Sequence, residues 1–220
     1  MSSIVIFGIG DFAEVVHASL KHDGRYEVCG FTIHEKYLSK TTFQGLDVVP
    51  FERVEEAFPS DRFAMFVAVG YRGINQVRAE LYSLCKRKNY RMVTYVSPRA
   101  SLIGNIELGE NCFIGENTVI RTSSRVGNNV IVGACCYMGQ NTVIRDHCFI
   151  SQSASLAGNL TIDEYAFIGP NSTIRDRIHI GSRCVIGAGA VVLRDTVPNG
   201  VYRAREAELL PVPSSDLKKL

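Results

Sequence analysis

The chain has 220 residues, which is room for one large domain or two modest ones. Hydrophobic residues make up 46% of it, and 24 basic residues against 22 acidic ones leave a formal net charge of +2. This near balance gives no electrostatic preference for a polyanion. The sequence also lacks an apolar run of about eighteen residues and a basic-then-apolar leader. We therefore expect a soluble, cytoplasmic protein that binds neither nucleic acid nor a membrane.

The N-terminal part of the chain begins with a strand, a glycine-rich turn and a helix. An apolar strand at residues 4–7 runs into Gly8–Ala13 (GIGDFA), and a helix is expected over residues 11–22. Such a turn lets the backbone approach a phosphate, because free N–H groups and the helix dipole favour anions there. An NAD site would also need an acid at the end of the second strand, predicted at residues 26–32. No acid follows that strand before Glu35, which disfavours a dinucleotide.

Further strands and helices complete this part of the chain. They are a short helix at 52–58, an apolar strand at 63–69, an amphipathic helix at 74–88 and a last strand at 92–96. The uninterrupted apolar run is typical of a central parallel strand buried on both faces. Ser97-Pro98 then marks a linker, since proline excludes the residue before it from the helical region. The order of the elements predicts a small doubly wound sheet over residues 1–97.

A ligand site is expected at one edge of this sheet, because ligands of doubly wound sheets bind beyond the carboxyl ends of the strands. The residues predicted to line it are Gly10, Asp11, Phe12, Thr32, Gly70, Tyr71 and Arg72.

The next hundred or so residues contain a repeat of six. An aliphatic residue returns at every sixth position from Leu102 to Val192, sixteen times without a break, and glycine follows it in eight of the sixteen repeats. A helix face would lose phase with this period, because its own repeat is 3.6 residues. A six-residue repeat instead fits a parallel β-helix, in which each repeat is one short strand and a corner.

The seven cysteines indicate neither a disulfide framework nor a metal site. No Cys-x-x-Cys occurs, and four of the seven (Cys112, Cys136, Cys148 and Cys184) stand two residues before the aliphatic column, where most of the other residues are small or β-branched. A cysteine there acts as a compact hydrophobe. We expect no metal site, because no pairs of ligands at short spacing are present.

Four local motifs bear a resemblance to a known family. They are IFGIGDFA (6–13), AVGYR (68–72), SLAGN (155–159) and GAGAVV (187–192). The chain resembles the hexapeptide-repeat nucleotide-sugar acyltransferases, in particular the sialic-acid O-acetyltransferases and the bacillosamine and perosamine N-acetyltransferases. The resemblance implies a Rossmann-like α/β domain that binds a nucleotide sugar, a left-handed β-helix over residues 98–200 and a C-terminal tail at 201–220.

The resemblance also implies an activity. It is the transfer of an acetyl group from acetyl-CoA, bound between two subunits of a homotrimer, to the amine of a nucleotide-linked amino sugar in bacterial surface-glycan synthesis. By the same resemblance Phe149 lies near the thioester, and Gly158, Pro170 and Ala188 face the pantetheine. An O-acetyltransferase is the alternative enzyme.

The chain departs from the family at the general base. The histidine that the family places after a hexapeptide glycine is Gln140 here, and its acidic or polar neighbour is Asn141. Glutamine cannot accept a proton near neutral pH, whereas histidine is suited to that task. Three interpretations stay open. Gln140 and Asn141 orient an amine that is already deprotonated; His147, one repeat later, acts as the base; or the protein is a weak or non-catalytic trimeric binding protein.

Overall fold

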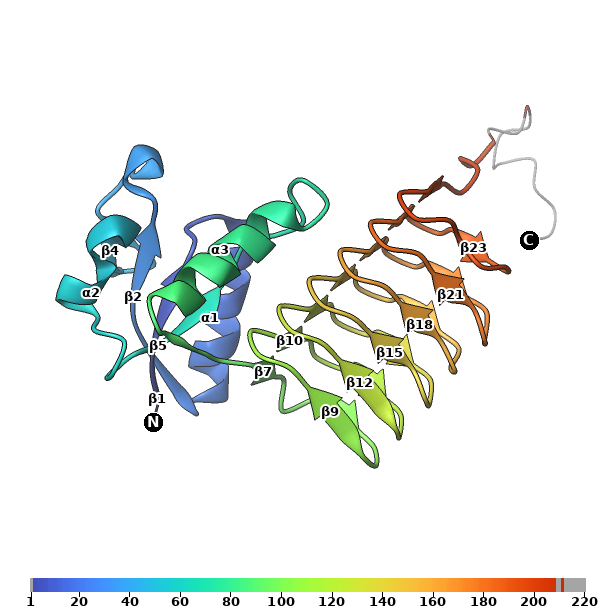
Figure 1. Ribbon diagram of the computed structural model, residues 1–220, viewed down its shortest axis with the longest axis horizontal. Coiled ribbons are helices and arrows are strands. Elements are labelled where there is room, and N and C mark those ends of the chain that lie inside the picture. The colour runs from blue at the N-terminus through green and yellow to red at the C-terminus, as the bar shows by residue number, and fades with distance from the viewer. Residues whose placement is uncertain (1, 209–210, 212–220) are drawn as a thin grey trace.

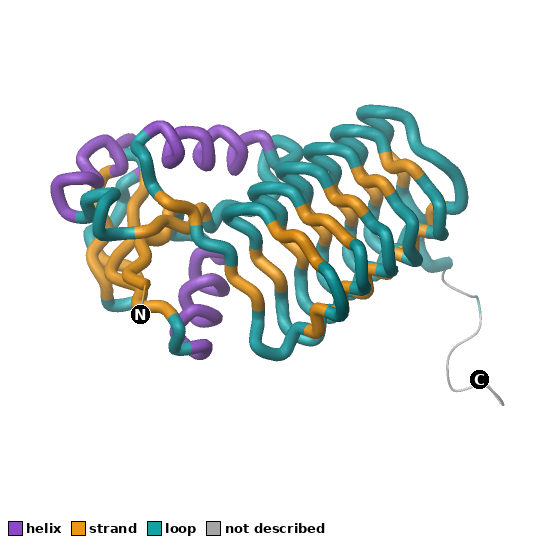
Figure 2. Tube along the Cα trace, turned by 60° about the horizontal axis from the view of Figure 1, so that its bottom comes forward, coloured by secondary structure: helices purple, strands orange, loops and turns teal. Residues whose placement is uncertain are grey.

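The structure, a computed structural model, describes residues 2–208 and 211. The chain forms two regions in sequence order (Figure 1). An α/β domain comes first, and a parallel β-helix extends away from it. Within the described residues the α-helices lie in the α/β domain, while the β-helix consists of short strands and turns stacked coil on coil (Figure 2).

The α/β domain is a six-stranded sheet with three helices. Its elements are β1 (Ser2–Phe7), α1 (Asp11–Asp23), β2 (Tyr26–Ile33), β3 (Thr42–Phe43), β4 (Leu46–Pro50), α2 (Val54–Ala57), β5 (Ala64–Val67), α3 (Gln76–Arg87) and β6 (Arg91–Met92), with 3₁₀ turns at Glu35–Tyr37 and Phe51–Arg53. The strand order is β3-β4-β2-β1-β5-β6. Each neighbouring pair is parallel except β3 and β4. The predicted doubly wound sheet is therefore confirmed, with one short antiparallel strand at its edge.

The two faces of this sheet are covered by different parts of the chain. Side chains alternate along a strand, so Ile4 and Ile6 of β1 face α1, and Val5 and Phe7 face α2 and α3. The α1 face also packs against residues of the β-helix, among them Phe113. The α/β domain and the β-helix thus share one apolar core.

The β-helix has three parallel sheets, here called sheets I, II and III. Sheet I contains β7 (Tyr95–Val96), β10 (Phe113–Ile114), β13 (Ile131–Val132), β16 (Phe149–Ile150), β19 (Phe167–Ile168), β22 (Val185–Ile186) and β24 (Val201–Tyr202). Sheet II contains β8 (Ser101–Leu102), β11 (Val119–Ile120), β14 (Tyr137–Met138), β17 (Ser155–Leu156), β20 (Thr173–Ile174) and β23 (Val191–Val192). Sheet III contains β9 (Ile106–Leu108), β12 (Ser124–Val126), β15 (Val143–Ile144), β18 (Thr161–Ile162) and β21 (His179–Ile180).

The six-residue repeat explains this geometry. Phe113 pairs with Ile131 and Ile131 pairs with Phe149, so each coil takes 18 residues, or three repeats. From residue 114 onward the aliphatic column is buried in the prism together with the small residues two positions before it. Each corner needs a residue in the left-handed region, which asparagine tolerates better than most residues. Such corner asparagines are Asn111, Asn117, Asn129, Asn141, Asn159 and Asn171.

The structure differs from the sequence expectations at three boundaries. The helix predicted at 74–88 begins at Gln76, because Gly73, Ile74 and Asn75 have φ values of 63°, 52° and 66°. The strand predicted at 92–96 divides into β6, which ends the α/β sheet, and β7, which pairs with β10. The β-helix therefore begins before residue 97. It also extends beyond residue 200, since β24 pairs with β22; residues 209–210 and 212–220 of the predicted tail lie outside the described residues.

Candidate functional site

A cavity of about 1070 Å³ lies at the carboxyl ends of β1 and β5. The turn after β1 lines this cavity, and the turn requires glycine at its first position. Gly8 has a φ of +125°, and a Cβ atom there would lie 2.7 Å from the carbonyl oxygen of Ala68. Glycine alone allows both the backbone conformation and the close approach. The N-terminus of α1, which favours anions, faces the same region.

Six of the seven residues predicted for this site line the cavity. They are Gly10, Asp11, Phe12, Gly70, Tyr71 and Arg72. Thr32 is not among the lining residues. Its side chain is fully buried, and its hydroxyl donates a hydrogen bond to the Val49 carbonyl at 2.9 Å. Thr32 therefore stabilises the β2–β4 pair, and its inward direction in the strand was not evident from the sequence.

The segment after β2 adds residues that the sequence reasoning did not assign to the site. His34, Lys36 and Lys40 line the cavity from there. His34 Nδ1 lies 2.8 Å from a Glu52 oxygen, and the other Glu52 oxygen accepts the N–H of Glu35 at 2.9 Å. Burial alone would raise the pKa of Glu52, but these hydrogen bonds outweigh it and hold that pKa below its usual range. Two lysines soon after a strand end were the available sequence signal.

The rim of this cavity rests on the β-helix. The ring of Tyr71 lies 5.2 Å from the ring of Phe149 and 4.8 Å from that of Phe167, on the outer face of sheet I. Phe149 and Phe167 stack on each other with their centroids 5.6 Å apart. Phe149, predicted to lie near a thioester, is therefore in contact with a residue predicted to bind the sugar nucleotide.

Gln140 and Asn141 lie at the corner between sheets II and III. Both residues follow β14, and both are exposed. The Asn141 side-chain NH₂ donates a hydrogen bond to Asn159 Oδ1 of the next coil at 3.2 Å. Gly158 stands one coil beyond Gln140 and has a φ of +133°. A Cβ atom on Gly158 would lie 3.2 Å from the Gln140 carbonyl oxygen, so the two residues pack closely.

The backbone of the coil at Gly158 departs from the regular repeat. One coil earlier, the Ser124 hydroxyl donates to the Gly139 carbonyl at 3.3 Å. The equivalent hydroxyl, on Thr142, is the buried side-chain oxygen without a hydrogen-bond partner among the described residues. The Ala157 carbonyl, its expected acceptor, instead points to Gly139, where a Cβ would meet it at 2.0 Å. The peptide between Ala157 and Gly158 is therefore turned over, which the positive φ of Gly158 permits.

His147 lies at a different corner, between sheets III and I, and ends a ladder of side-chain amides. The Val67 N–H donates to Asn111 Oδ1 at 2.8 Å, so Asn111 presents its NH₂ to Asn129 Oδ1, also at 2.8 Å. Asn129 must then donate its own NH₂ to His147 Nδ1, at 3.0 Å. The Val67 N–H can only donate, and it thereby sets the direction of every bond in the ladder.

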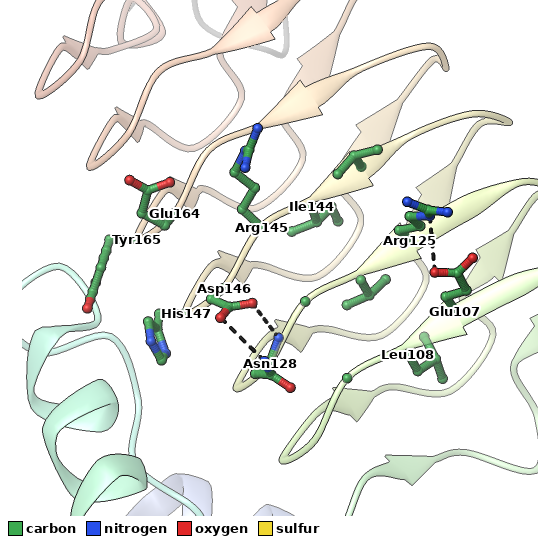
Figure 3. A pocket seen from close by; sticks show the side chains of 14 residues that line it. Glu107, Leu108, Arg125, Asn128, Ile144, Arg145, Asp146, His147, Glu164 and Tyr165 are labelled. Atoms are coloured by element: carbon green, nitrogen blue, oxygen red, sulfur yellow. Dashed lines mark hydrogen bonds and ion pairs between the residues drawn. The ribbon is translucent and has the colours of Figure 1, made fainter.

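This ladder gives His147 a structural role. Nδ1 is an acceptor in the ladder, and the neutral ring then has its proton on Nε2. Burial lowers the pKa of His147 from its usual value, which also favours the neutral ring. The ring contacts Tyr165 at 4.9 Å and Tyr82 of α3 at 5.9 Å. His147 and Tyr165 lie beside α3, whereas Glu107 and Arg125 lie farther along sheet III (Figure 3).

The three residues predicted as catalytic are therefore not brought together within one chain. Gln140 and Asn141 share one corner, and His147 occupies another, because the repeat places residues six apart on successive sheets. The residues predicted for acetyl-CoA are also divided. Gly158 follows β17 at the corner between sheets II and III, while Pro170 and Ala188 follow β19 and β22 at the corner between sheets I and II.

Several buried cysteines are inert packing residues. The thiols of Cys112, Cys136 and Cys148 contact backbone carbonyls inside the prism. Burial raises their pKa values to about 11, 11 and 12. Within the described part of the chain no group of three His, Cys, Asp or Glu side chains is arranged to hold a metal ion. None of the helices in that part is long and apolar enough to cross a bilayer.

Two family profiles match the sequence. The profile of the PglD N-terminal domain matches residues 3–85, and that of the bacterial transferase hexapeptide (six repeats) matches residues 105–140 and 159–194. The chain joins a PglD-type N-terminal domain to bacterial-transferase hexapeptide repeats. This confirms the resemblance stated from the sequence motifs. Among curated proteins, none matches the chain significantly.

Solved structures share this PglD-type and hexapeptide-repeat architecture over nearly the full chain. The acetyltransferase domain of PglB from Neisseria gonorrhoeae matches with a TM-score of 0.82 and 22% identity, over 96% of this chain and 100% of that one. A histidine-to-asparagine mutant of perosamine N-acetyltransferase from Caulobacter crescentus, in complex with CoA and GDP-perosamine, matches with a TM-score of 0.84 and 23% identity, over 93% and 94%. WeeI from Acinetobacter baumannii matches with a TM-score of 0.81 and 22% identity, over 91% of this chain and 96% of that one. The α/β domain followed by a left-handed β-helix is thereby confirmed.

Proposed function

We propose that this protein is an acyltransferase that moves an acetyl group from acetyl-CoA to the amine of a nucleotide-linked amino sugar in bacterial surface-glycan synthesis. The observation that supports this most is the contact between the two regions. The cavity of the α/β domain opens at the carboxyl ends of its strands, and its rim residue Tyr71 lies on Phe149 of the β-helix. A sugar held in that cavity is thus directed along the outside of the prism. A perosamine N-acetyltransferase mutant of the same fold was solved in complex with CoA and GDP-perosamine.

The cavity has the chemistry of a site for a nucleoside diphosphate. Ile9 and Gly10, which follow β1, and the first turn of α1 offer backbone N–H groups to a phosphate. Lys36, Lys40 and Arg72 bring three cations to the same cavity. An arginine fork and lysine ammonium groups both suit phosphate oxygens.

The exposed surfaces of the prism favour a homotrimer packed through sheet II. Sheet I is covered in part by the α/β domain, and sheet III carries ion pairs such as Arg125 with Glu107. In sheet II the exposed side chains of Tyr137 and Val191 are apolar, and Ile103 and Leu193, which directly follow strands of this sheet, are exposed as well. Exposed apolar side chains that gather on one side of a protein favour an interaction surface there. We assign its occupant as a second copy of this chain.

A threefold ring would also unite the divided site. If sheet II faces the axis, its two edges lie at two different subunit boundaries, and each boundary joins unlike edges because the interface is heterologous. The corner with Gln140 and Gly158 then meets the neighbour's corner with Pro170 and Ala188. Acetyl-CoA would lie between these corners, and the sugar would come from the neighbour's cavity.

The chemistry at Gln140 is positioning rather than proton removal. A glutamine amide can orient a nucleophile by hydrogen bonding but does not titrate. The amine would attack the thioester carbon as the free base and then lose its second proton to water. The C–S bond then breaks, CoA leaves as the thiolate, and the acetylated amine remains as an amide. Holding the amine and the thioester together can by itself supply several kcal/mol of the barrier. A hydroxyl nucleophile would need a base, so O-acetylation is the second candidate only if a base is found.

A thiol-release assay with acetyl-CoA and a panel of nucleotide-linked amino sugars tests the proposal. We expect turnover with at least one amino sugar and none with the matching hydroxyl sugars. Turnover only with hydroxyl sugars would make the protein an O-acetyltransferase. Binding of CoA or a nucleotide sugar without turnover would favour the non-catalytic trimer.

A subunit-mixing experiment tests the shared site. Arg72→Ala should impair the cavity, and Gln140→Ala should lower kcat at the corner about tenfold, each in homotrimers. If unlike edges meet, random co-assembly of the two variants leaves about a quarter of the sites intact, and activity should rise above that of either homotrimer to at least about that fraction of the wild type. No recovery in trimers shown to be mixed would place both residues of a site in the same subunit.

A further inference from the structure

The segment between β5 and α3, residues 70–75, has a strained backbone. Gly73, Ile74 and Asn75 are three successive residues with positive φ. For a β-branched side chain such as Ile74 this conformation is rare, and left-handed residues other than glycine cost roughly 1–2 kcal/mol each. Strain of this kind persists only where surrounding contacts hold it. The same segment bears Tyr71 and Arg72, which line the cavity.

Arg78, on the first turn of α3, supplies one set of those contacts. Its side chain is the largest fully buried one in the described structure. One guanidinium nitrogen, Nη1, donates to the Gly70 carbonyl at 3.0 Å and to Asn75 Oδ1 at 2.9 Å. The other, Nη2, donates to the carbonyls of His147 at 2.9 Å and Cys148 at 3.1 Å. The guanidinium thus joins the cavity rim directly to the corner of the β-helix.

The hydrogen-bond partners of Arg78 indicate that it fixes the positions of backbone groups and does not form an ion pair. Within residues 2–208 its recorded partners are carbonyl and amide oxygens, the Asn129 carbonyl included, and no carboxylate is among them. Burial lowers the pKa of Arg78 to about 10, so it remains a cation at neutral pH. A buried cation without a counter-ion is costly, and the planar fork of arginine suits several fixed acceptors where an ammonium does not.

Asn75 supplies the second set of contacts. It is fully buried, and its Nδ2 donates to the carbonyls of Tyr165 at 3.1 Å and Ala166 at 3.2 Å. Its N–H donates to the Tyr71 carbonyl at 3.1 Å, which closes the segment on itself. Arg78 and Asn75 together bind carbonyls on three successive coils of the β-helix, at Asn129, His147–Cys148 and Tyr165–Ala166.

We propose that Arg78 and Asn75 are positioning residues, through which the β-helix holds the strained 70–75 segment in the conformation that presents Tyr71 and Arg72 to the nucleotide sugar. The inference rests on the proposed function, because it assigns a substrate to that segment. On this proposal, the nucleotide-sugar site takes its binding conformation only when the α/β domain is packed against the β-helix. The α/β domain alone would leave the segment without the contacts that hold its left-handed residues.

Steady-state kinetics of Arg78→Lys test the proposal. Lysine keeps the charge but cannot reach the rim and the coil carbonyls together. We expect the KM for the nucleotide sugar to rise about tenfold, while the KM for acetyl-CoA stays within about twofold, since 1.4 kcal/mol corresponds to a factor of ten. Asn75→Gly keeps the left-handed backbone and removes the side-chain amide. It should likewise raise the KM for the nucleotide sugar and leave the KM for acetyl-CoA nearly unchanged. Equal changes in both KM values, or none in a folded variant, would overturn the proposal.

Two controls separate positioning from general damage. Lys86→Met removes another link between α3 and the β-helix, the exposed ion pair with Glu110, and should leave both KM values unchanged. Ile74→Gly relieves the strained position, so adding it to Arg78→Lys should restore part of the lost affinity for the nucleotide sugar. A double variant no better than Arg78→Lys would contradict the role given to the strain.

Hydrogen exchange separates this proposal from the proposed function. In Arg78→Lys we expect faster exchange of the backbone amides of residues 70–79 than in the wild type, with α1 unchanged. Faster exchange in a protein that acetylates no sugar would refute the proposed function and leave the positioning intact. Unchanged exchange in the variant would refute the positioning, whatever the enzyme does.

Discussion

Two corners of the same prism have opposite roles, although one six-residue pattern builds both. At the corner between sheets III and I, Asn129 and His147 are engaged in an amide ladder, and α3 packs over them. At the corner between sheets II and III, Gln140 and Asn141 are exposed, and the backbone at Gly158 breaks the repeat. The first corner joins the two regions of the chain, and the second remains available to a ligand. A histidine in the sequence is therefore not by itself a guide to the corner where we propose that the reaction takes place.

The largest effect is expected from Gly158→Ala, which attacks the exposed corner. Alanine cannot adopt a φ of +133° without strain, so the Ala157–Gly158 peptide should return to the regular orientation. A displacement of about 1 Å at a reacting centre can reduce turnover about 100-fold, and we expect a loss of that order in kcat/KM for acetyl-CoA. Gly24→Ala is the control, because Gly24 has a φ of +72° at the end of α1, far from the corner, and should lower only stability.

Gln140→Ala removes the side chain proposed to orient the amine. One hydrogen bond contributes about 1–1.5 kcal/mol, so kcat should fall roughly tenfold with little change in the KM for acetyl-CoA. The pH dependence of kcat/KM should follow the ammonium group of the sugar in both proteins, since the side chain at position 140 does not titrate in either of them. An additional ionisation near the usual pKa of histidine in the wild type would contradict this account.

Substitutions of His147, at the corner between sheets III and I, should change the stability of the protein and not its turnover. His147→Ala leaves the buried Asn129 amide without its acceptor, which costs about 1–3 kcal/mol in the free energy of unfolding. His147→Asn supplies an oxygen acceptor and tolerates the left-handed backbone, so it should lose much less. Urea unfolding of the two variants measures the difference, and equal losses would show that the ladder contributes nothing.

The same histidine predicts a pH dependence of folding. The folded protein resists protonation of His147 because burial lowers its pKa, whereas the unfolded chain binds the proton at the usual value near 6.5. The free energy of unfolding should therefore be unaffected above that pH and decrease as the pH falls below it. His17, whose pKa burial also lowers, contributes in the same direction. His147→Asn should decrease the slope in urea titrations between neutral pH and pH 5.5, and an unchanged slope would contradict the assignment.

The smallest effect is expected from Thr142→Val at the exposed corner. The Thr142 hydroxyl has no partner in the described structure, so replacing it by a methyl group should be neutral or stabilise by up to about 1 kcal/mol. Thr118→Val is the matched change, because the Thr118 hydroxyl donates to the Gly133 carbonyl at 2.7 Å and accepts the Cys136 N–H at 3.2 Å. That variant should be less stable than the wild type. Similar values for the two variants would remove the argument for a turned peptide.

Much of the fold could be predicted from the sequence, because the information is periodic. The column from Leu102 to Val192 sets the strands and the burial, and the GIGDFA turn sets the first strand–helix connection. The site was less accessible. Thr32 was placed by its position at a strand end, but the direction of its side chain depends on register with β4. His147 is close to Gln140 in sequence, and only the assignment of repeats to sheets separates their corners.

Long-range contacts explain the remaining omissions. Arg78 binds carbonyl groups of the β-helix that are 51 to 70 residues away in sequence, and Asn75 binds a carbonyl group 90 residues away. Because any residue type has a backbone carbonyl, the sequence does not indicate these acceptors. The left-handed Ile74 is likewise invisible to a sequence pattern that predicts a helix from residue 74. Both follow from how the two regions dock.

The most direct test compares turnover of Gln140→Ala and His147→Asn with the wild type in one thiol-release assay on the same amino-sugar substrate. The account predicts that His147→Asn keeps kcat within about twofold, whereas Gln140→Ala loses about tenfold, the effect of one hydrogen bond in the transition state. Loss of turnover in a folded, CoA-binding His147→Asn protein, with Gln140→Ala unaffected, would contradict it. The base would then lie at the corner covered by α3.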